Sequence, residues 1–419
     1  MFDDLLKILD QSEHGKRYAA YASTSSTSNF QPKIDTIMKT IASFQSGKNK
    51  CDITNALIFM IVKDDMRLST TEKTGFKHFM NVVAPHYQPP LHRAVTDCVD
   101  RKYKVHSRIV KEKLENASYY TLTADLWTET NTTSFLGITI HFLENTRLKS
   151  LTLGITELQD RHTSENLQCE CKNIIENWNI SLNKVSAIVT DNGPNIVKAV
   201  CDTFGEVKHI ACFAHTYNIV LHSAIAKSAH LNELLMKIKS IVTYFKHSVV
   251  ASDALKPAQT SSQPLRPIQD VSTRWNSTFF MLYRFIEIVE HISTVLLKFP
   301  KSPPMLSASE IEVLREIIAI LKPMELATTE MCGQTYTTCS KVIPILCCLE
   351  KNFKAACMTS PIAIQLRNDI LDQLEIRFRN ITKSYIHSVA TVLDPRYKRV
   401  NFNKNCGDAA LAFIRIDKE

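Results

Sequence analysis

The chain has 419 residues, of which 44% are hydrophobic and 22% are charged, a composition typical of a protein with a sizeable buried core and unlike that of a disordered tail. The formal net charge of +8 suits a polyanionic partner without requiring one. No apolar stretch is long enough to span a bilayer and no signal-peptide pattern opens the chain, so the 12 cysteines, which follow no regular framework, indicate reduced thiols in the cytosol or nucleus.

The first 118 residues are predicted to be helical apart from one linker. Residues 1–30 indicate a short helix and a Ser/Thr-rich linker, and residues 31–118 a helical domain. Its last helix, from Leu91 to Leu114, has a basic side. The cations on that side are Arg101, Lys102, Lys104 and Arg108. Two interpretations remain open: a merely solvated face, or a surface that contacts phosphates.

From Tyr119 the apolar pattern changes to that of β-strands. Three extended runs, 119–127, 135–143 and 148–158, predict an antiparallel meander. A helix, a strand over 185–190, a second helix, a strand over 207–213 and a long helix follow. The resulting order, β-β-β-α-β-α-β-α, is the layout of the ribonuclease H-like fold, an α/β class in which the first and fourth strands are neighbours at the centre of the sheet.

Two acidic residues occupy the ends of those two strands. Asp125 lies in Thr123-Ala-Asp125-Leu-Trp127, and Asp191 follows the 185–190 strand directly. Each could be an ordinary turn former or helix cap. On adjacent strands they would meet although 66 positions separate them, and two carboxylates together suit a hard cation such as Mg²⁺. We therefore expect a cation site at this edge of the sheet.

The rest of the chain is predicted to be helical. Residues 119–247 form the predicted ribonuclease H-like core, a polar, proline-containing stretch over 248–270 is assigned as a loop, and residues 271–419 are assigned to a helical insertion domain.

Several motifs in this order resemble the hAT superfamily (hobo and Activator type) of transposases, including its domesticated, BED-finger-associated branch. The motifs are Gly75-Phe76, Pro85-His86-Tyr87, Thr123-Ala-Asp125-Leu-Trp127-Thr128, Thr190-Asp191-Asn192-Gly193, Cys212-Phe-Ala-His215, Ser272-Thr-Arg274-Trp275-Asn276 and Leu393-Asp394-Pro395-Arg396-Tyr397-Lys398. They span most of the chain.

The resemblance implies that Asp125 and Asp191 are the first two members of an Asp-Asp-Glu site that holds two divalent ions for DNA strand cleavage. The family's third acid lies in a C-terminal Glu-Arg-containing motif, which is not found before the sequence stops at Glu419. We expect a vestigial site with weak Mg²⁺ binding and without strand-transfer activity. The BED finger is not detected either, because no cysteine precedes Cys51. A homodimer would be weakened, since the family's dimerisation region is C-terminal.

Two motifs have both a structural and a functional interpretation. Cys212 and His215 have metal-ligand spacing, but without a second pair the motif favours core packing. Arg274 and Trp275 could grip a phosphate and, by the resemblance, stack on a flipped base, or Trp275 could anchor the first helix of the insertion.

The sequence and its resemblance to the hAT superfamily thus imply a truncated or domesticated hAT-like protein that binds DNA in the nucleus without strand transfer and has no membrane partner. Regulation of transcription is one role that such a protein would have. Two alternatives remain: an active transposase or nuclease, if the chain is a fragment of a longer product, and a scaffold for protein interactions.

Overall fold

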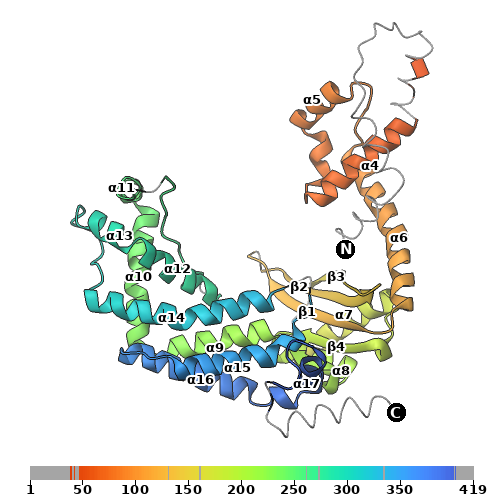
Figure 1. Ribbon diagram of the computed structural model, residues 1–419. Helices are drawn as coiled ribbons and strands as arrows, with labels where there is room; N and C mark the ends of the chain where they lie inside the picture. Colours follow the sequence, from red (N-terminus) through yellow and green to blue (C-terminus); the bar gives the residue numbers. More distant parts are fainter. Residues whose placement is uncertain are drawn as a thin grey trace. The chain divides into compact units, whose positions relative to one another are not determined.

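The computed structural model describes residues 38–39, 42, 47–130, 132–159, 162–260, 262–271, 274–333, 336–400 and 402. The predicted N-terminal helix and linker of residues 1–30 lie outside these ranges. The chain divides into two compact units (Figure 1). One comprises Met1–Ile188 with Lys198–His209, and the other comprises Val189–Val197 with Ile210–Glu419. The path of the chain therefore passes from one unit to the other within the β-sheet region.

The first unit begins with helices around two small apolar cores. Its elements are α4 (Lys48–Lys63), η2 (Leu68–Glu72), α5 (Thr74–Val83) and α6 (His92–Asn116). Val95 of α6 packs on Leu57, Ile58 and Ile61 of α4, and Tyr87 packs with Met80 of α5. The long helix predicted over Leu91–Leu114 is α6, which ends two residues later than expected.

A five-stranded mixed sheet follows, and the predicted meander forms its first three strands. These are β1 (Tyr120–Thr128), β2 (Ser134–Glu144) and β3 (Arg147–Leu158), paired antiparallel in sequence. The spatial order is β3-β2-β1-β4-β5, where β4 is Val185–Thr190 and β5 is His209–Ala211. The prediction that the first and fourth strands are neighbours is confirmed.

One face of the meander is buried and the other is partly open. Leu122 and Ala124 of β1 alternate with half-exposed threonines, as period-two strands with one buried face do. Helix α7 (Ser164–Asn177) packs on the buried face, where Ile174 lies against Gly154. A threonine caps this helix: the Thr163 side chain accepts the Asn166 backbone N–H.

A β-bulge in β3 has a structural use. The register passes from Ile138 paired with Gly154 to Thr139 paired with Thr152, so Leu153 is the extra residue. Its carbonyl accepts the indole N–H of Trp178 at 2.5 Å, and Trp178 is the residue that ends α7. The bulge thus secures the end of a helix.

The predicted bounds hold for the fourth strand but not for the fifth. Strand β4 has the predicted bounds, and α8 (Pro194–Phe204) ends at Gly205, whose φ of +93° few other residues adopt. The predicted length of β5 is wrong: the strand has three residues, where the sequence predicts a run over 207–213. A 3₁₀ turn, η4 (Glu206–Lys208), precedes it, and Phe213 already begins the next helix.

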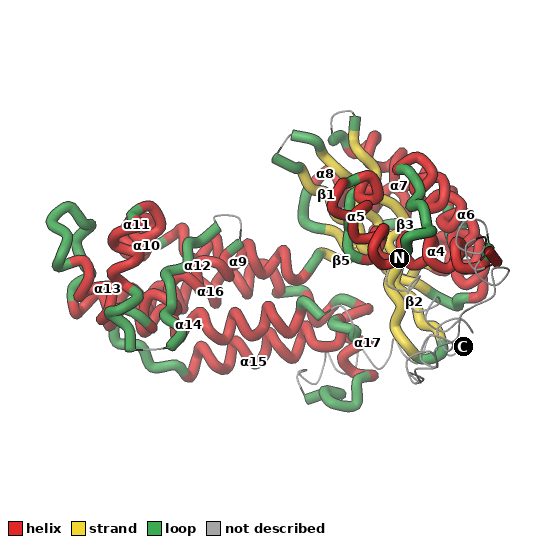
Figure 2. Tube along the Cα trace, turned by 90° about the horizontal axis from the view of Figure 1, so that it is seen from above, coloured by secondary structure: helices red, strands yellow, loops and turns green. Residues whose placement is uncertain are grey.

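The second unit is a bundle of helices (Figure 2). Their buried apolar side chains form one continuous core. Its helices are α9 (Phe213–Lys227), α10 (Ala229–His247), α11 (Val249–Leu255), α12 (Trp275–Glu287), α13 (Val289–Leu296), α14 (Ala308–Met331), α15 (Val342–Ala355), α16 (Pro361–Phe378) and α17 (Tyr385–Leu393). Two described 3₁₀ helices lie among them: η5 (Cys339–Lys341) precedes α15, and η6 (Ile381–Lys383) precedes α17. This core includes residues of α9 and α10. The sequence places both helices in the predicted ribonuclease H-like core of residues 119–247, and those domain boundaries stay a prediction.

The prediction of a loop over 248–270 is partly wrong, because α11 lies inside it. Ser248 caps α11 by accepting the Ala251 backbone N–H, and Ala251 and Leu255 are buried. Two apolar anchors and one cap suffice for a two-turn helix within a polar stretch. Among the described helices, none combines the length and the apolarity that crossing a bilayer requires.

Candidate functional site

Asp125 lies on the half-open face of β1. It follows the buried Ala124 and is exposed, and it pairs across the ladder with Gly137 of β2. One oxygen, Oδ1, accepts the backbone N–H of Leu126 at 3.1 Å. Its Oδ2 accepts no hydrogen bond from the residues that the structure describes.

The aromatic ring of Trp127 lies beside Asp125 on this face. The indole stacks on Phe135 with ring centroids 5.7 Å apart. A Cβ atom at residue 137 would lie only 2.9 Å from the ring, so Gly137 is the residue that lets the indole lie flat on the sheet. Sequence reasoning missed Gly137, because a glycine in a strand usually signals a bulge.

A row of polar side chains continues along the same face. The Thr123 hydroxyl contacts Nε2 of His141 at 3.2 Å, and Nδ1 of His141 contacts the Ser150 hydroxyl at 2.8 Å. Burial lowers the pKa of His141, which favours the neutral ring. This row makes the partly open face polar on the N-terminal side of Asp125.

Asp191 follows β4 directly and forms a local turn. Its Oδ1 accepts the Gly193 backbone N–H at 3.0 Å, as expected of a turn-forming Asp. A Cβ atom at residue 193 would lie 3.1 Å from the same oxygen, so glycine allows the turn to close tightly. Asp191 is half-buried, and within the described ranges its Oδ2 accepts no hydrogen bond. Turn formation and ligand binding are compatible at this residue.

The Asp191 turn is tied to the start of α9. The Asn192 side-chain amide donates to the Thr216 hydroxyl at 2.9 Å, and that hydroxyl donates to the Cys212 carbonyl at 2.9 Å. The Cys212 backbone N–H donates to the Thr190 carbonyl at 2.7 Å. Cys212 thus contributes through its backbone at the N-cap of α9. Thr216 was missed from sequence because a helical threonine one turn into a helix carries no distinctive signal.

The strand order places the two acid-bearing strands next to each other in the sheet. Within the ranges that the structure describes, no group of three or more His, Cys, Asp and Glu side chains could hold a metal ion. Neither the Cys212 and His215 pair nor the two aspartates are part of such a group, and their ligand roles stay predictions.

The cations of α6 form an exposed stripe. Arg101, Lys104 and Arg108 are exposed and recur at i, i+3 and i+7, which places them on one side of the helix. None has an ion-pair partner among the described residues, whereas Lys113 on the same helix pairs with Glu144 at 2.9 Å. Lys102 is half-buried, and burial together with the Lys102 charge lowers the pKa of His106.

Arg274 and Trp275 have opposite environments. Arg274 is exposed. Trp275 is 2% exposed, opens α12 and belongs to the core of the helical unit, where it contacts Phe279. The Trp275 backbone N–H donates to Oδ1 of Asn218 in α9 at 3.2 Å. This burial favours the anchoring interpretation of Trp275, because a stacking base would need the exposed face that the indole here lacks.

Two protein-family models match consecutive parts of the chain. Residues 123–211 match the family model of the ZBED1 RNase-like domain, and residues 210–320 match that of the ZBED1 RNase-like helical domain. The junction falls in β5, beside the boundary between the two units. Together with the relatives described next, these matches support a transposase-derived protein of the hAT/BED type.

Individual relatives in this hAT/BED group include both BED proteins and transposases. Human zinc finger BED domain-containing protein 6 is 28% identical over 83% of this chain. The maize putative AC transposase is 26% identical over 81%, and the Drosophila melanogaster transposable element Hobo transposase is 25% identical over 49%. The chain spans 37%, 44% and 30% of the length of these relatives, respectively.

Proposed function

We propose that this hAT/BED-type protein is a nuclear DNA-binding protein that contacts the phosphate backbone through α6 and acts by occupying DNA, as a regulator of transcription would. In this proposal the sheet with α7 and α8 is a ribonuclease H-like core, and the helical unit is its insertion. The observation that carries the proposal is the exposed stripe of Arg101, Lys104 and Arg108 without ion-pair partners in the described ranges.

The size of the stripe suits a DNA strand. Seven residues of helix separate Arg101 from Arg108, a rise of about 10 Å, over which one strand presents about three phosphates. From residue 101 to residue 111 the sequence has five cations and no acid, so the helix surface repels cations and attracts a polyanion.

The two aspartates are proposed as a remnant of a cleavage site. Carboxylate oxygens are the ligands that Mg²⁺ prefers, and Asp125 and Asp191 each keep one oxygen that no described backbone N–H occupies. If bound, Mg²⁺ would polarise a phosphodiester. Asp125 and Asp191 alone would hold it weakly, which supports binding rather than cutting. A magnesium-dependent nicking assay with Asp125→Asn as the control would revive the nuclease alternative if the wild type cuts and the variant does not.

The DNA-binding proposal is tested with a charge-reversed helix. Replacing Arg101, Lys104 and Arg108 by Glu should reduce the dependence of log K on log salt by about 2 to 3, because each phosphate contact contributes a slope of about 0.9. Lys113→Gln is the matched control, since Lys113 is already paired with Glu144. Full affinity and an unchanged slope in the triple variant would contradict the role of α6 and favour the protein-scaffold alternative.

A further inference from the structure

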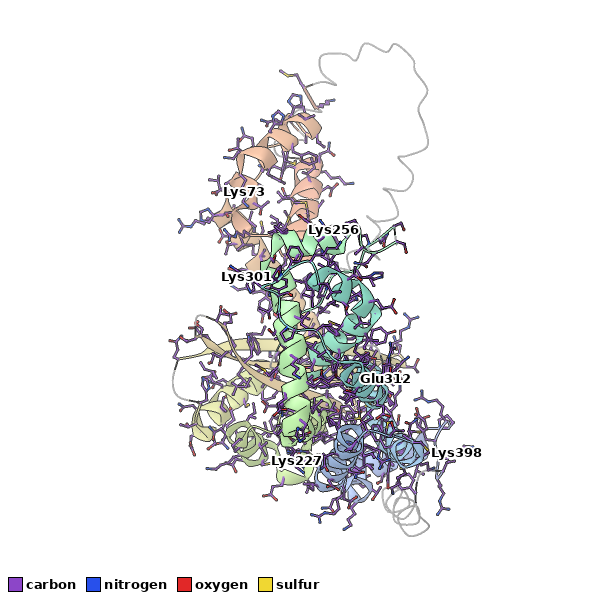
Figure 3. All side chains as sticks on the ribbon, turned by 90° about the vertical axis from the view of Figure 1, so that its left-hand side faces the viewer. Lys73, Lys227, Lys256, Lys301, Glu312 and Lys398 are labelled. Carbon is purple, nitrogen blue, oxygen red and sulfur yellow. The ribbon has the colours of Figure 1, made fainter. Side chains whose placement is uncertain are left out.

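A groove lined mainly by hydroxyl-bearing residues lies in the helical unit, far along the chain from α6. It has a volume of about 600 Å³ and lies between the last turns of α10 and the segment 301–304 that follows α13. Its walls include Ser240, Thr243, Tyr244, His247, Lys301 and Ser302. We call this surface the tip groove. Figure 3 shows Lys301 and Lys256 near one end of α10 and Lys227 near the other.

The surroundings of the tip groove have an excess of positive charge. Residues 240–260 and 288–306 together contain four lysines but only two acids, Asp253 and Glu290. Asp253 is already paired with Lys256 at 2.7 Å. Lys301 has no ion-pair partner in the described part of the chain. It lies five residues beyond the end of α13, too far to serve the C-terminal end of that helix as nearby cations often do.

Hydroxyl-bearing side chains make up most of the rest of the lining. Five of the nine lining residues carry a hydroxyl, so the groove is rich in groups that donate hydrogen bonds. Three of these hydroxyls are engaged within the protein: Ser248 accepts the Ala251 N–H, Thr243 donates to Gln269, and Ser302 donates to the Leu296 carbonyl.

The other two hydroxyls have no such engagement. Those of Ser240 and Tyr244 have no hydrogen-bond partner among the residues that the structure describes, and Tyr244 is half-buried. A lysine next to two available hydroxyl donors is the combination that proteins use to contact DNA phosphates.

We propose that the tip groove is a second contact for duplex DNA, in which Lys301 faces a phosphate and the hydroxyls of Ser240 and Tyr244 donate to backbone oxygens. This inference rests on the proposed DNA-binding function and names a site on the helical unit for it. An acidic peptide fits less well, because peptide docking draws its energy from buried apolar anchors, and Pro303 and Pro304 are the only wholly apolar residues in this lining.

The test measures the affinity of the full chain for a labelled duplex by fluorescence anisotropy over a range of NaCl concentrations. Lys301→Gln should weaken binding several-fold and lower the salt slope by about 0.9, since one released counterion is lost. Tyr244→Phe should weaken binding about two- to tenfold with an unchanged slope, because it removes a neutral hydrogen bond and no charge. Lys256→Gln, the same charge change at the same end of α10 but outside the groove lining, should bind like the wild type.

Four outcomes overturn the inference. If Lys301→Gln and Tyr244→Phe bind like the wild type while the α6 variant is impaired, the groove is no DNA contact and the proposed function survives. An equal loss in Lys256→Gln would reveal a general charge effect. If Lys301→Gln and Tyr244→Phe lost binding to a poly-glutamate peptide but kept their affinity for the duplex, the groove would be assigned to acidic proteins. A wild-type chain that does not bind the duplex would remove both proposals. Thermal unfolding of each variant is the control for folding. We expect a Tm close to that of the wild type, because all three side chains are exposed or partly exposed.

Discussion

Replacing Trp275 separates its two interpretations, an anchor of the helical unit and a platform for a DNA base. The side chain is 2% exposed, and a tryptophan buries roughly 200 Å², worth about 5 kcal/mol at about 25 cal/mol per Å². Alanine keeps part of this area buried, and the site can partly collapse around it, so the expected loss for Trp275→Ala is about 3 to 5 kcal/mol. Trp275→Phe keeps an aromatic ring against Phe279 and should lose less than half of that.

The assay is thermal unfolding followed by far-UV circular dichroism. Tryptophan fluorescence is unsuitable, because the substitution itself removes one of the three tryptophans of the chain and so changes the signal. For a unit of about 200 residues, each kcal/mol shifts the Tm by roughly 2 to 4 °C, so Trp275→Ala should lower the Tm of the helical unit by roughly 6 to 20 °C. DNA affinity per folded molecule should stay unchanged. A Tm within 2 °C of the wild type, together with a tenfold loss of DNA affinity, would refute the anchoring argument.

Three other changes test features described above. Thr216→Val removes the hydroxyl that links the Asp191 turn to α9 and should cost about 1 to 2 kcal/mol of unfolding free energy in urea titrations, whereas Thr216→Ser should cost less; equal values would contradict the link. Asp369→Asn removes the charge of a largely buried carboxylate that Lys227 contacts at 3.4 Å. Because that lysine is half-exposed and can rehydrate, the free energy of unfolding should fall by only about 1 to 2 kcal/mol, and a fall above about 4 kcal/mol would contradict this expectation. Burial lowers the pKa of His387 to about 4, so the unfolded chain binds the proton more tightly; stability should be full above about pH 6.5 and fall by roughly 1 kcal/mol per pH unit towards pH 4, and His387→Gln should flatten that slope.

The sequence predicted the parts of the fold that depend on local pattern. Alternating apolar residues and β-branched side chains identified β1 to β4, and the run from Val185 to Thr190 has the predicted bounds. The adjacency of β1 and β4 followed from the order of elements. Patterns of this kind persist because each strand must bury one face whatever its neighbours are.

The remainder depended on contacts between distant residues. The shortness of β5 reflects an early start of α9, and α11 owes its existence to the burial of Ala251 and Leu255 in a core assembled from other helices. The role of Thr216 requires Asn192, 24 positions away. The burial of Trp275 likewise could not be read from its own neighbourhood, because an Arg-Trp pair has the same sequence whether the indole faces a base or a core.

The bulge at Leu153 has an evolutionary consequence. A deletion of one residue there would let β2 and β3 pair without interruption, yet it would leave the Trp178 indole N–H without its acceptor. The strand could therefore shorten only in lineages where position 178 had already lost its donor, for example as phenylalanine. Loss of one residue in a strand and replacement of a side chain 25 positions later should appear together in descendants of this fold.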